Sequence, residues 1–399
     1  MEQFLQKIKE VQTTLKQLAI EGWLLYDFRR SNPLALSFLE IPPEKMLSRR
    51  FFYWIPQTGI PIKIVSQVEP NGLAHLPGET KVYHSWQQLE QFLKKILIDH
   101  PIIAMEYSPN NAIPVISKVD GGTIDWMRQL GAQVVSSAHL LQHYTSVWTD
   151  AQLQQHLAAA HVLDTTAAKT WAYIQQHLQM NQPITEYQVQ QFMLECIESQ
   201  ECMTEYPPTC AVNQNSADPH YSPQKESSFP IKRGDLILID LWCKKKTLDA
   251  VYADISRMGI AAAQASAEQE TVFSVVKEAR DVATQLIQDH YTQQRPIQGW
   301  QVDQACREVI IQKGYGAYFV HRTGHNIGTQ VHGSGTNLDN LETHDERELL
   351  AGTCFSVEPG IYLPAKFGIR LEYDIYLDPQ GTIKITGGIQ EKFIYLFEN

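Results

Sequence analysis

The chain has 399 residues, of which 43% are hydrophobic and 19% are charged, and its formal net charge is −11. This composition allows one large domain or two ordinary domains with real cores, and it excludes a disordered chain. An acidic chain repels phosphate backbones and anionic membranes, so we expect neither nucleic acid nor a membrane as a partner.

The N-terminus and the cysteines predict a location in the cytoplasm. Charged residues recur at helical spacing over residues 2–20, which indicates an amphipathic helix rather than a signal peptide. No apolar run approaches the roughly 18 residues that a membrane-spanning helix needs. The six cysteines are scattered and form no C-x-x-C pair, so we expect reduced, buried thiols.

The first part of the chain alternates between predicted strands and helices. Gly22 is expected to end the first helix, and WLLYDF at 23–28 is typical of a strand. RFFYWIP and IKIVSQ flank QTGIP and predict a hairpin. A helix over 86–98 with Ser85 as its cap, the strand IIAMEY, the helix IDWMRQLG and the strand AQVVSS follow. We therefore predict an α/β domain over residues 1–148.

A long helical stretch opens the second predicted domain, residues 149–399. The stretch is rich in Ala, Leu and Gln, and Asp150 before it is a good N-cap candidate. Further helices are expected near 185–199, 265–292 and 301–313, with strand pairs and turn residues between them.

Two strand pairs in this domain each carry two acids that lie 14 residues apart. LILID ends on Asp240 and VYADIS contains Asp254, with the polar turn KKKTLD between them. FSVEPGIYL carries Glu358 and GIRLEYDIYL carries Glu372, with PAKFG as the turn. Acids inside apolar strands are costly unless they are paired or bind metal, and divalent cations would relieve their repulsion. Four unrelated surface or hydrogen-bonded acids are the alternative interpretation.

Clustered histidines favour the metal interpretation. HRTGHNIGTQVHG holds His321, His325 and His332, and its glycines let the backbone bend tightly near a ligand. His220 lies in NQNSADPHYSP, which is typical of a loop. Oxygen-rich ligation with one imidazole suits manganese, cobalt, iron or zinc, and two such ions that share a water form a hydrolytic design.

Five segments together resemble one known family, the pita-bread metallopeptidases. DLILIDL, VYADISR, TGHNIG, VEPGIY and GIRLEYD occur in the order found in that family, which includes methionine aminopeptidase, aminopeptidase P and prolidase. The resemblance covers nearly the whole chain. It implies an α/β N-terminal (creatinase-like) domain, an α+β pita-bread catalytic domain, and two divalent metal ions, with manganese as the first choice and cobalt, iron or zinc as alternatives.

The resemblance implies a role for each candidate residue. Glu358 would ligate metal and also act as the general base. The metal ligands it implies are Asp240, Asp254, His325, Glu358 and Glu372. His220 would contact substrate and help to shuttle protons, and His332 would stabilise the tetrahedral intermediate. His321 would belong to the substrate pocket, and Arg370 would orient carboxylates or contact substrate.

The chain departs from the family pattern at three points. The spacing between Asp240 and Asp254 is longer than usual, and we expect KKKTLD to lengthen the turn and leave the strand pairing intact. Trp242 replaces the glycine of D-L-G, which puts a bulky aromatic side chain near the metal site or just outside it. Gly333 replaces the glutamate that commonly follows V-H.

Prolidases and aminopeptidases P both resemble this chain in having an N-terminal domain of this kind, and the compact domain here is closer to that of prolidases than to that of the longer aminopeptidases P. The favoured function is therefore hydrolysis of Xaa-Pro dipeptides, and the resemblance implies a homodimer. Hydrolysis of longer Xaa-Pro peptides is the alternative. A dipeptidase needs a cation for the substrate carboxylate. Arg370 and Arg347 are the candidates, although Arg347 is also explained as a solvated loop charge. The proline ring would lie against aromatic residues, each of which is also explained by packing: Tyr221, Trp242 and Tyr362.

Two further hypotheses differ in class. The chain could be a non-catalytic binding protein on the same fold, although such relatives usually lose metal ligands and none is lost here. It could also be an enzyme that acts on a small non-peptide substrate, for which the altered D-L-W segment leaves room.

Overall fold

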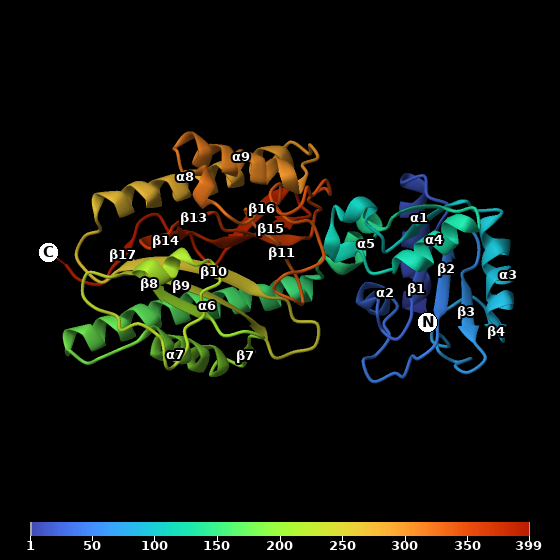
Figure 1. The fold of residues 1–399 in the computed structure, drawn as a ribbon, viewed down its shortest axis with the longest axis horizontal. Coiled ribbons are helices and arrows are strands. Elements are labelled where there is room, and N and C mark those ends of the chain that lie inside the picture. The colour runs from blue at the N-terminus through green and yellow to red at the C-terminus, as the bar shows by residue number, and fades with distance from the viewer. Residues whose placement is uncertain (1, 399) are drawn as a thin grey trace. The chain divides into compact units, whose positions relative to one another are not determined.

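The computed structural model describes residues 2–398 and divides into two compact units, Met1–Thr145 and Ser146–Asn399 (Figure 1). None of the described helices is both long enough and apolar enough to cross a membrane. Each unit has its own hydrophobic clusters.

The N-terminal unit is built on one six-stranded sheet with the order β4-β3-β2-β1-β5-β6. Its strands are β1 (Gly22–Asp27), β2 (Phe51–Pro56), β3 (Ile62–Ser66), β4 (Glu79–Tyr83), β5 (Ile102–Met105) and β6 (Gln133–Ser136). Strand β2 runs antiparallel to both neighbours, and the other strand pairs are parallel. The predicted hairpin around QTGIP is therefore confirmed, and β1, β3, β4, β5 and β6 all point the same way.

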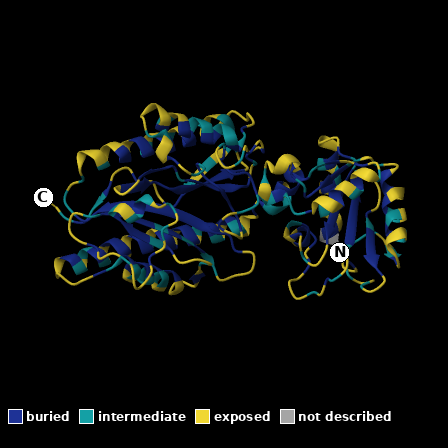
Figure 2. Ribbon diagram, viewed as in Figure 1, coloured by how far each residue is buried: buried dark blue, intermediate teal, exposed yellow. Residues whose placement is uncertain are grey.

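Helices cover both faces of this sheet (Figure 2). They are α1 (Glu2–Gln17), α2 (Pro33–Phe38), α3 (Trp86–Leu97), α4 (Gly121–Gln129) and α5 (Ala138–Thr145), with short 3₁₀ turns η1 (Pro109–Asn111) and η2 (Pro114–Ile116). Trp23 and Leu25 of β1 face one cluster, and Leu24 and Tyr26 face the other, because successive side chains on a strand alternate in direction. The predicted cap is confirmed, since the Ser85 side chain accepts a hydrogen bond from the backbone of α3.

The C-terminal unit begins with the predicted long helix. Its helices are α6 (Asp150–Gln179), α7 (Glu186–Glu198), α8 (Ala267–Thr292) and α9 (Gly299–Gln312), with 3₁₀ turns η3 (Asn213–Ala217) and η4 (Gly316–Tyr318). The prediction of Asp150 as the cap of α6 is wrong. Thr149 is the cap, because its side chain and that of Gln152 bond reciprocally to the backbone in a capping box. Asp150 instead lies in the first turn, where its charge favours the helix dipole.

Strands of this unit form three sheets between the helices. The first contains β7 (Cys202–Met203), β8 (Thr209–Val212), β9 (Leu236–Lys245), β10 (Ala253–Ile260) and β17 (Ile394–Tyr395). The second contains β11 (Asn326–Ile327), β12 (Cys354–Val357), β15 (Tyr373–Asp378) and β16 (Thr382–Thr386), and the third contains β13 (Gly360–Leu363) and β14 (Phe367–Arg370). Helices α8 and α9 cover one side of the sheets, and α6 and α7 cover the other (Figure 1).

The two sides of β9 face different clusters. Ile237 and Ile239 pack with α6 and α7, whereas Leu236 and Leu238 pack with α8 and α9. By the same alternation Asp240 points to the side of Leu238, which is the side where the other two sheets lie.

The second acidic hairpin has the predicted turn but an interrupted ladder. Strand β12 pairs with β15, and β13 pairs with β14. Glu358 lies between β12 and β13, and Glu372 lies between β14 and β15. The prediction that each glutamate lies inside a strand is therefore wrong. Pro359, which follows Glu358, has no backbone N–H to continue a ladder.

Candidate metal centre

The first pair of acids lies on the hairpin of β9 and β10. Ser256 is opposite Asp240 in the antiparallel ladder, and Trp242 is opposite Asp254. Residues two apart on a strand share a face, so Asp240, Asp254 and Ser256 point to the same side of the sheet. The ladder continues unbroken from Cys243 to Leu236, which confirms that the longer spacing is absorbed by the turn.

His325 is fixed by the strand beside it. Its backbone N–H donates to Ser356 Oγ at 3.0 Å, and the Ser356 backbone N–H donates to the His325 carbonyl at 2.9 Å. Gly324 makes this approach possible, because a Cβ there would lie 1.9 Å from the Ser356 carbonyl oxygen. The imidazole Nε2 then lies 3.2 Å from Glu358 Oε1 and 3.7 Å from Asp254 Oδ2.

The five predicted metal-ligating residues converge. Ligand atoms of Asp254, His325 and Glu372 lie within 4.8 Å of one another. Glu358 belongs to the same cluster, because its Oε1 lies 3.2 Å from His325 Nε2. Asp240 joins it through Ser256, whose hydroxyl lies 3.1 Å from Asp240 Oδ1 and 2.7 Å from Glu372 Oε2.

Ser256 was missed by the sequence analysis although it lies at the centre of the cluster. It also accepts a hydrogen bond from Arg370 Nε at 2.9 Å, while Arg370 Nη2 donates to Asp240 Oδ2 at 2.6 Å. A signal was present, because Ser256 lies two residues after Asp254 in the same strand and must therefore share its face.

Burial and mutual repulsion raise the pKa of most of these acids. Burial raises the pKa of Asp254 well above its ordinary value, and the charges of Glu372 and Asp240 raise it further. Burial, followed by the charges of Glu358 and Asp240, does the same to Glu372. Burial also raises the pKa of Asp240, although Arg370 opposes the rise. Burial acts upward on Glu358 too, but the hydrogen bond and charge of His325 outweigh it and hold the pKa of that carboxyl well below its usual range.

This arrangement fits divalent cations. Asp254 Oδ1 is buried and has no hydrogen-bond partner among the residues that the structure describes. A buried acceptor without a partner is costly, and a coordinated cation would satisfy it. Four carboxylates with one imidazole form a donor set for hard or borderline ions such as manganese, cobalt, iron or zinc.

A fifth acid, Asp374, is fully buried next to Asp254, and the sequence analysis did not predict its role. Its Oδ2 accepts a hydrogen bond from the Asp254 backbone N–H at 2.9 Å and lies 4.0 Å from His156 Nε2. Burial lowers the pKa of His156 to about 4, so this imidazole is neutral near pH 7. Asp374 therefore orients the backbone of Asp254.

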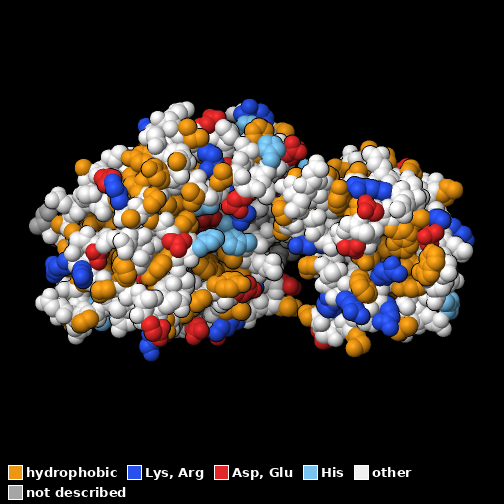
Figure 3. Space-filling model, in the orientation of Figure 1, with side chains coloured by type: hydrophobic (Ala, Val, Ile, Leu, Met, Phe, Trp, Pro, Cys, Tyr) orange, Lys and Arg blue, Asp and Glu red, His pale blue; other side chains and the backbone are white. Residues whose placement is uncertain are grey.

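A cavity of about 500 Å³ opens over the cluster. All nine predicted site residues line it, including the four expected to contact substrate: His220, His321, His332 and Arg370. Histidine side chains gather on this face of the C-terminal unit, as Figure 3 shows in pale blue. Further lining residues that the sequence did not single out are Tyr206, Pro207, Thr209, Arg322, Val331 and Glu342.

Two histidines of the cavity, His332 and His321, have lowered pKa values. The ring of His332 lies 4.3 Å from that of His325, centroid to centroid, and the charge of His325, followed by burial, lowers the pKa of His332 to about 3. Burial lowers the pKa of His321 to about 4. Since His321 Nδ1 lies 2.7 Å from the Arg322 carbonyl it must carry the proton, so Nε2 accepts from the Tyr362 hydroxyl at 2.7 Å.

Two aromatic residues expected in the pocket wall are there, and one is not. Tyr221 and Trp242 line the cavity. Tyr362 is buried behind it, where its hydroxyl accepts from Arg370 Nη1 at 2.9 Å. Gly333, which departs from the family pattern, fits a tight packing position, because a Cβ there would lie 2.2 Å from Asn326 Oδ1.

Arg347 neither anchors substrate nor extends into solvent, so both interpretations of this residue are wrong. It is fully buried and does not line the cavity. Its guanidinium donates to both oxygens of Asp345 and to the carbonyls of Ser334 and Gly335, at 2.6 to 2.9 Å. These bonds occupy the fork, so Arg347 braces the loop that precedes β12.

Comparisons with known proteins agree with this fold. Residues 155–379, more than half of the chain, match the family model described as Metallopeptidase family M24. A stretch of 159 residues is 33% identical to an Xaa-Pro dipeptidase of Lactobacillus helveticus and covers 40% of this chain and 39% of that protein, so the match spans about two fifths of the relative's length. Two solved structures match almost the whole chain: dipeptidase PepE from Mycobacterium ulcerans (TM-score 0.70, 20% identity, 98% of both chains) and a recombinant prolidase from Thermococcus sibiricus (TM-score 0.63, 21% identity, 98% of this chain and 99% of that one). They confirm the predicted two-part architecture at the level of the fold.

Proposed function

The chain belongs to metallopeptidase family M24, as its motifs predicted, and from this premise we propose that it hydrolyses the Xaa-Pro bond of dipeptides. The relative from Lactobacillus helveticus is an Xaa-Pro dipeptidase, which supports this substrate class. The observation that carries the proposal is the convergence of Asp254, His325 and Glu372 within 4.8 Å at the base of a cavity.

The proposed centre holds two divalent cations, with manganese as the first choice. Asp240, Asp254, His325, Glu358 and Glu372 are the ligands in this proposal. Bound divalent cations would polarise the scissile carbonyl and lower the pKa of a coordinated water. Ser256, Arg370 and Asp374 have a different role, since each bonds to a ligand residue and fixes its orientation.

Glu358 is the proposed general base. Its carboxylate lines the cavity beside the other proposed ligands, where it can accept a proton from the attacking water and pass it to the leaving imide nitrogen. His332 and His220 line the open side of the cavity, where their ring N–H groups can donate to the oxygen that becomes negative in the transition state. His321 is tied to Tyr362 and the Arg322 carbonyl, so it forms a fixed wall.

In this proposal the cavity supplies an apolar wall for the proline ring and an arginine for the substrate carboxylate. Tyr206, Pro207 and Val331 supply apolar surface for a ring that lacks an N–H to be recognised. Of the arginines in the lining, Arg370 is committed to Asp240, whereas Arg322 has only a loose ion pair with Glu342 at 4.0 Å. We assign Arg322 to the carboxylate of a dipeptide, a role for which the sequence analysis considered Arg370 and Arg347.

The remaining parts of the proposal concern the setting of the enzyme. We propose a homodimer in the cytoplasm that takes proline-containing di- or oligopeptides and binds no nucleic acid. Sedimentation analysis of the purified chain tests the dimer, and a fluorescent fusion in cells tests the location.

The experiment that tests the function uses the full chain supplied with manganese or cobalt. The expected result is rapid release of free proline from Xaa-Pro dipeptides and slower hydrolysis of Xaa-Pro peptides with further residues. Faster cleavage of the longer peptides would favour an aminopeptidase instead. No hydrolysis of either substrate, with metal bound by elemental analysis, would reject the proposal.

A further inference from the structure

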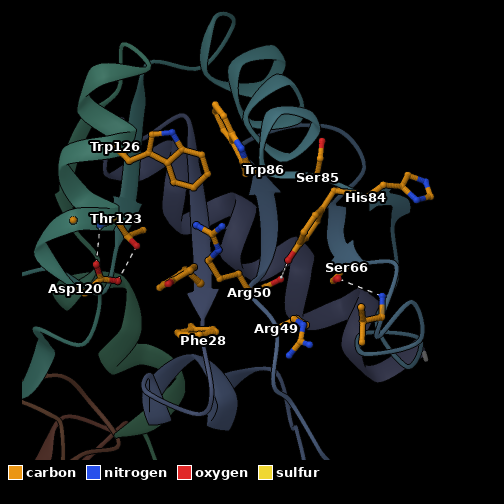
Figure 4. A pocket seen from close by; sticks show the side chains of 14 residues that line it. Phe28, Arg49, Arg50, Ser66, His84, Ser85, Trp86, Asp120, Thr123 and Trp126 are labelled. Carbon is orange, nitrogen blue, oxygen red and sulfur yellow. Dashed lines mark hydrogen bonds between the residues drawn. The ribbon is translucent and has the colours of Figure 1, made fainter.

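A second cavity, of about 840 Å³, opens in the N-terminal unit (Figure 4). Its lining includes Phe28, Ser66 and Tyr83, which lie at the carboxyl ends of β1, β3 and β4. The first turns of α3 and α4 supply Trp86 and Thr123. Open α/β sheets characteristically bind ligands at the carboxyl ends of their strands, and the proposed hydrolysis makes no use of this site.

Aromatic side chains form the walls of this cavity. Trp86 and Trp126 come from two different helices, and Figure 4 shows both indoles on the same side of the cavity. Trp86 is 61% exposed and Phe28 is 39% exposed, and Tyr26 and Tyr83 form the floor with little exposure. Large apolar side chains gathered at the mouth of a cavity mark a surface that a ligand would cover.

The cavity also contains an arginine that has an aromatic neighbour but no anionic partner. The Arg50 guanidinium lies 5.5 Å from the centre of the Trp126 ring and points toward the indoles (Figure 4). The guanidinium makes no hydrogen bond and no ion pair with any residue in the described part of the chain, 2–398, and Arg50 is bonded only through its carbonyl, which accepts from the Tyr83 hydroxyl at 2.8 Å. A planar guanidinium with all five N–H groups available is suited to a carboxylate or phosphate.

The other charges that line the cavity are already engaged. Arg49 Nη1 donates to the Ser48 carbonyl and hydroxyl, and the Arg49 backbone N–H donates to Glu69 at 3.2 Å. Asp120 accepts from the backbone N–H and the hydroxyl of Thr123 at 2.9 and 2.7 Å, so it serves as the cap of α4. The charged residues of the lining are therefore two arginines and one aspartate, and only the Arg50 guanidinium is left without a hydrogen bond.

We propose that this cavity binds a planar aromatic anion of about nucleotide size, with its ring against Trp86 and Trp126 and its phosphate or carboxylate on the Arg50 guanidinium. Stacking on the indoles accounts for the exposed aromatic walls, and the anion gives Arg50 its missing partner. The indoles alone would accept any flat ring, and Arg50 alone would accept any anion. A ligand that contacts the indoles and Arg50 together must carry a ring and an anionic group on one molecule.

Isothermal titration of the full chain with four probes tests the proposal. Adenosine monophosphate and N-acetyltryptophan carry both a ring and an anion, whereas adenosine lacks the anion and inorganic phosphate lacks the ring. At least one of the first two should bind ten or more times more tightly than adenosine and phosphate. Whichever of the two binds more tightly identifies a phosphate or a carboxylate as the recognised group.

Variants connect that binding to the cavity. Arg50→Ala and Trp86→Ala should each weaken binding of the better probe at least tenfold. Arg128→Ala is the matched control, because Arg128 also lies over a ring, that of Tyr107, but does not line the cavity. Absence of binding by both ring-bearing anions, or binding that survives Arg50→Ala with an unchanged melting temperature, would overturn the proposal. Hydrolysis of Xaa-Pro dipeptides is measured on the same samples, so that failure of either proposal is seen separately.

Discussion

Removal of divalent cations should make the C-terminal unit progressively less stable as the pH rises. The pKa values of Asp254 and Glu372 lie well above their ordinary values, because burial and neighbouring carboxylates disfavour the charged forms. A group with a raised folded pKa contributes stability that is fully present below its unfolded pKa, about 4, and is lost as the pH rises through the folded pKa. Glu358, with its lowered pKa, has the opposite sign, but its contribution is lost only below about pH 4.

The size of the cation effect follows from linkage. A cation that binds only the folded state, at 100 times its dissociation constant, adds about 2.7 kcal/mol to the free energy of unfolding. For a unit of the size of Ser146–Asn399, each kcal/mol raises the melting temperature by about 2–4 °C. Manganese added to chelator-treated protein should therefore raise the melting temperature by about 5–11 °C near pH 8 in calorimetry.

The Asp254→Asn variant tests both the repulsion among the buried carboxylates and the binding of the cation. The variant keeps the shape of the side chain but removes one buried charge from the cluster. Without metal it should be more stable than the wild type near pH 8, and manganese should no longer raise its melting temperature. Asp289→Asn, an exposed change on α8, is the control and should behave as the wild type. An equal manganese shift in Asp254→Asn and the wild type would refute the cation centre.

Three further substitutions test the proposed roles. Glu358→Gln should lower kcat by about 10²–10⁴-fold at saturating manganese in steady-state assays, as expected for loss of a general base, and an unchanged kcat would exclude that role. Arg322→Ala should raise KM for an Xaa-Pro dipeptide about tenfold or more and leave KM for the Xaa-Pro amide unchanged. Only the dipeptide has a carboxylate that can bond to Arg322, so only the dipeptide loses a charged hydrogen bond. An equal rise in KM for both substrates would contradict the anchoring role of Arg322. Arg347→Met should lower the free energy of unfolding by about 3–5 kcal/mol in urea denaturation, since Asp345 is left buried without its partner, and a loss below about 1 kcal/mol would contradict the bracing role.

The metal-centre residues could be predicted because each lies in a short motif with its own local signal. Asp240 follows an apolar strand, and His325 lies beside a glycine that lets the backbone approach its neighbour. For Ser256 the signal was its spacing of two residues from Asp254 in one strand, and Asp374 gave no comparable signal. Their contribution depends on which face of a strand points to the centre, and that face is set by the packing of α8 and α9 against the sheets.

The environment of Arg347 could not be predicted from the residues next to it in the sequence. HDERELLAG is polar, and a polar segment before a strand is typical of a solvated loop. The fold instead places Asp345 two residues before the arginine and the carbonyls of Ser334 and Gly335 on its other side, which lets a charged pair be fully buried. The second cavity gave no sequence signal either, because Arg50, Trp86 and Trp126 are far apart in the chain and become neighbours only through the order of the strands.

The interrupted hairpin explains how two glutamates reach one centre. The register is the same on both sides of the break, since Val357 pairs with Tyr373 and Gly360 pairs with Arg370. Continued without interruption, that register would place Glu358 directly opposite Glu372, and like charges directly opposite on neighbouring strands destabilise a ladder. Loss of pairing at this point removes the constraint of strict alternation, so one carboxylate can turn to His325 and the other to Ser256. Pro359, which has no backbone N–H, accounts for the break in the ladder, and a bound cation would relieve the remaining repulsion between the two glutamates beside it.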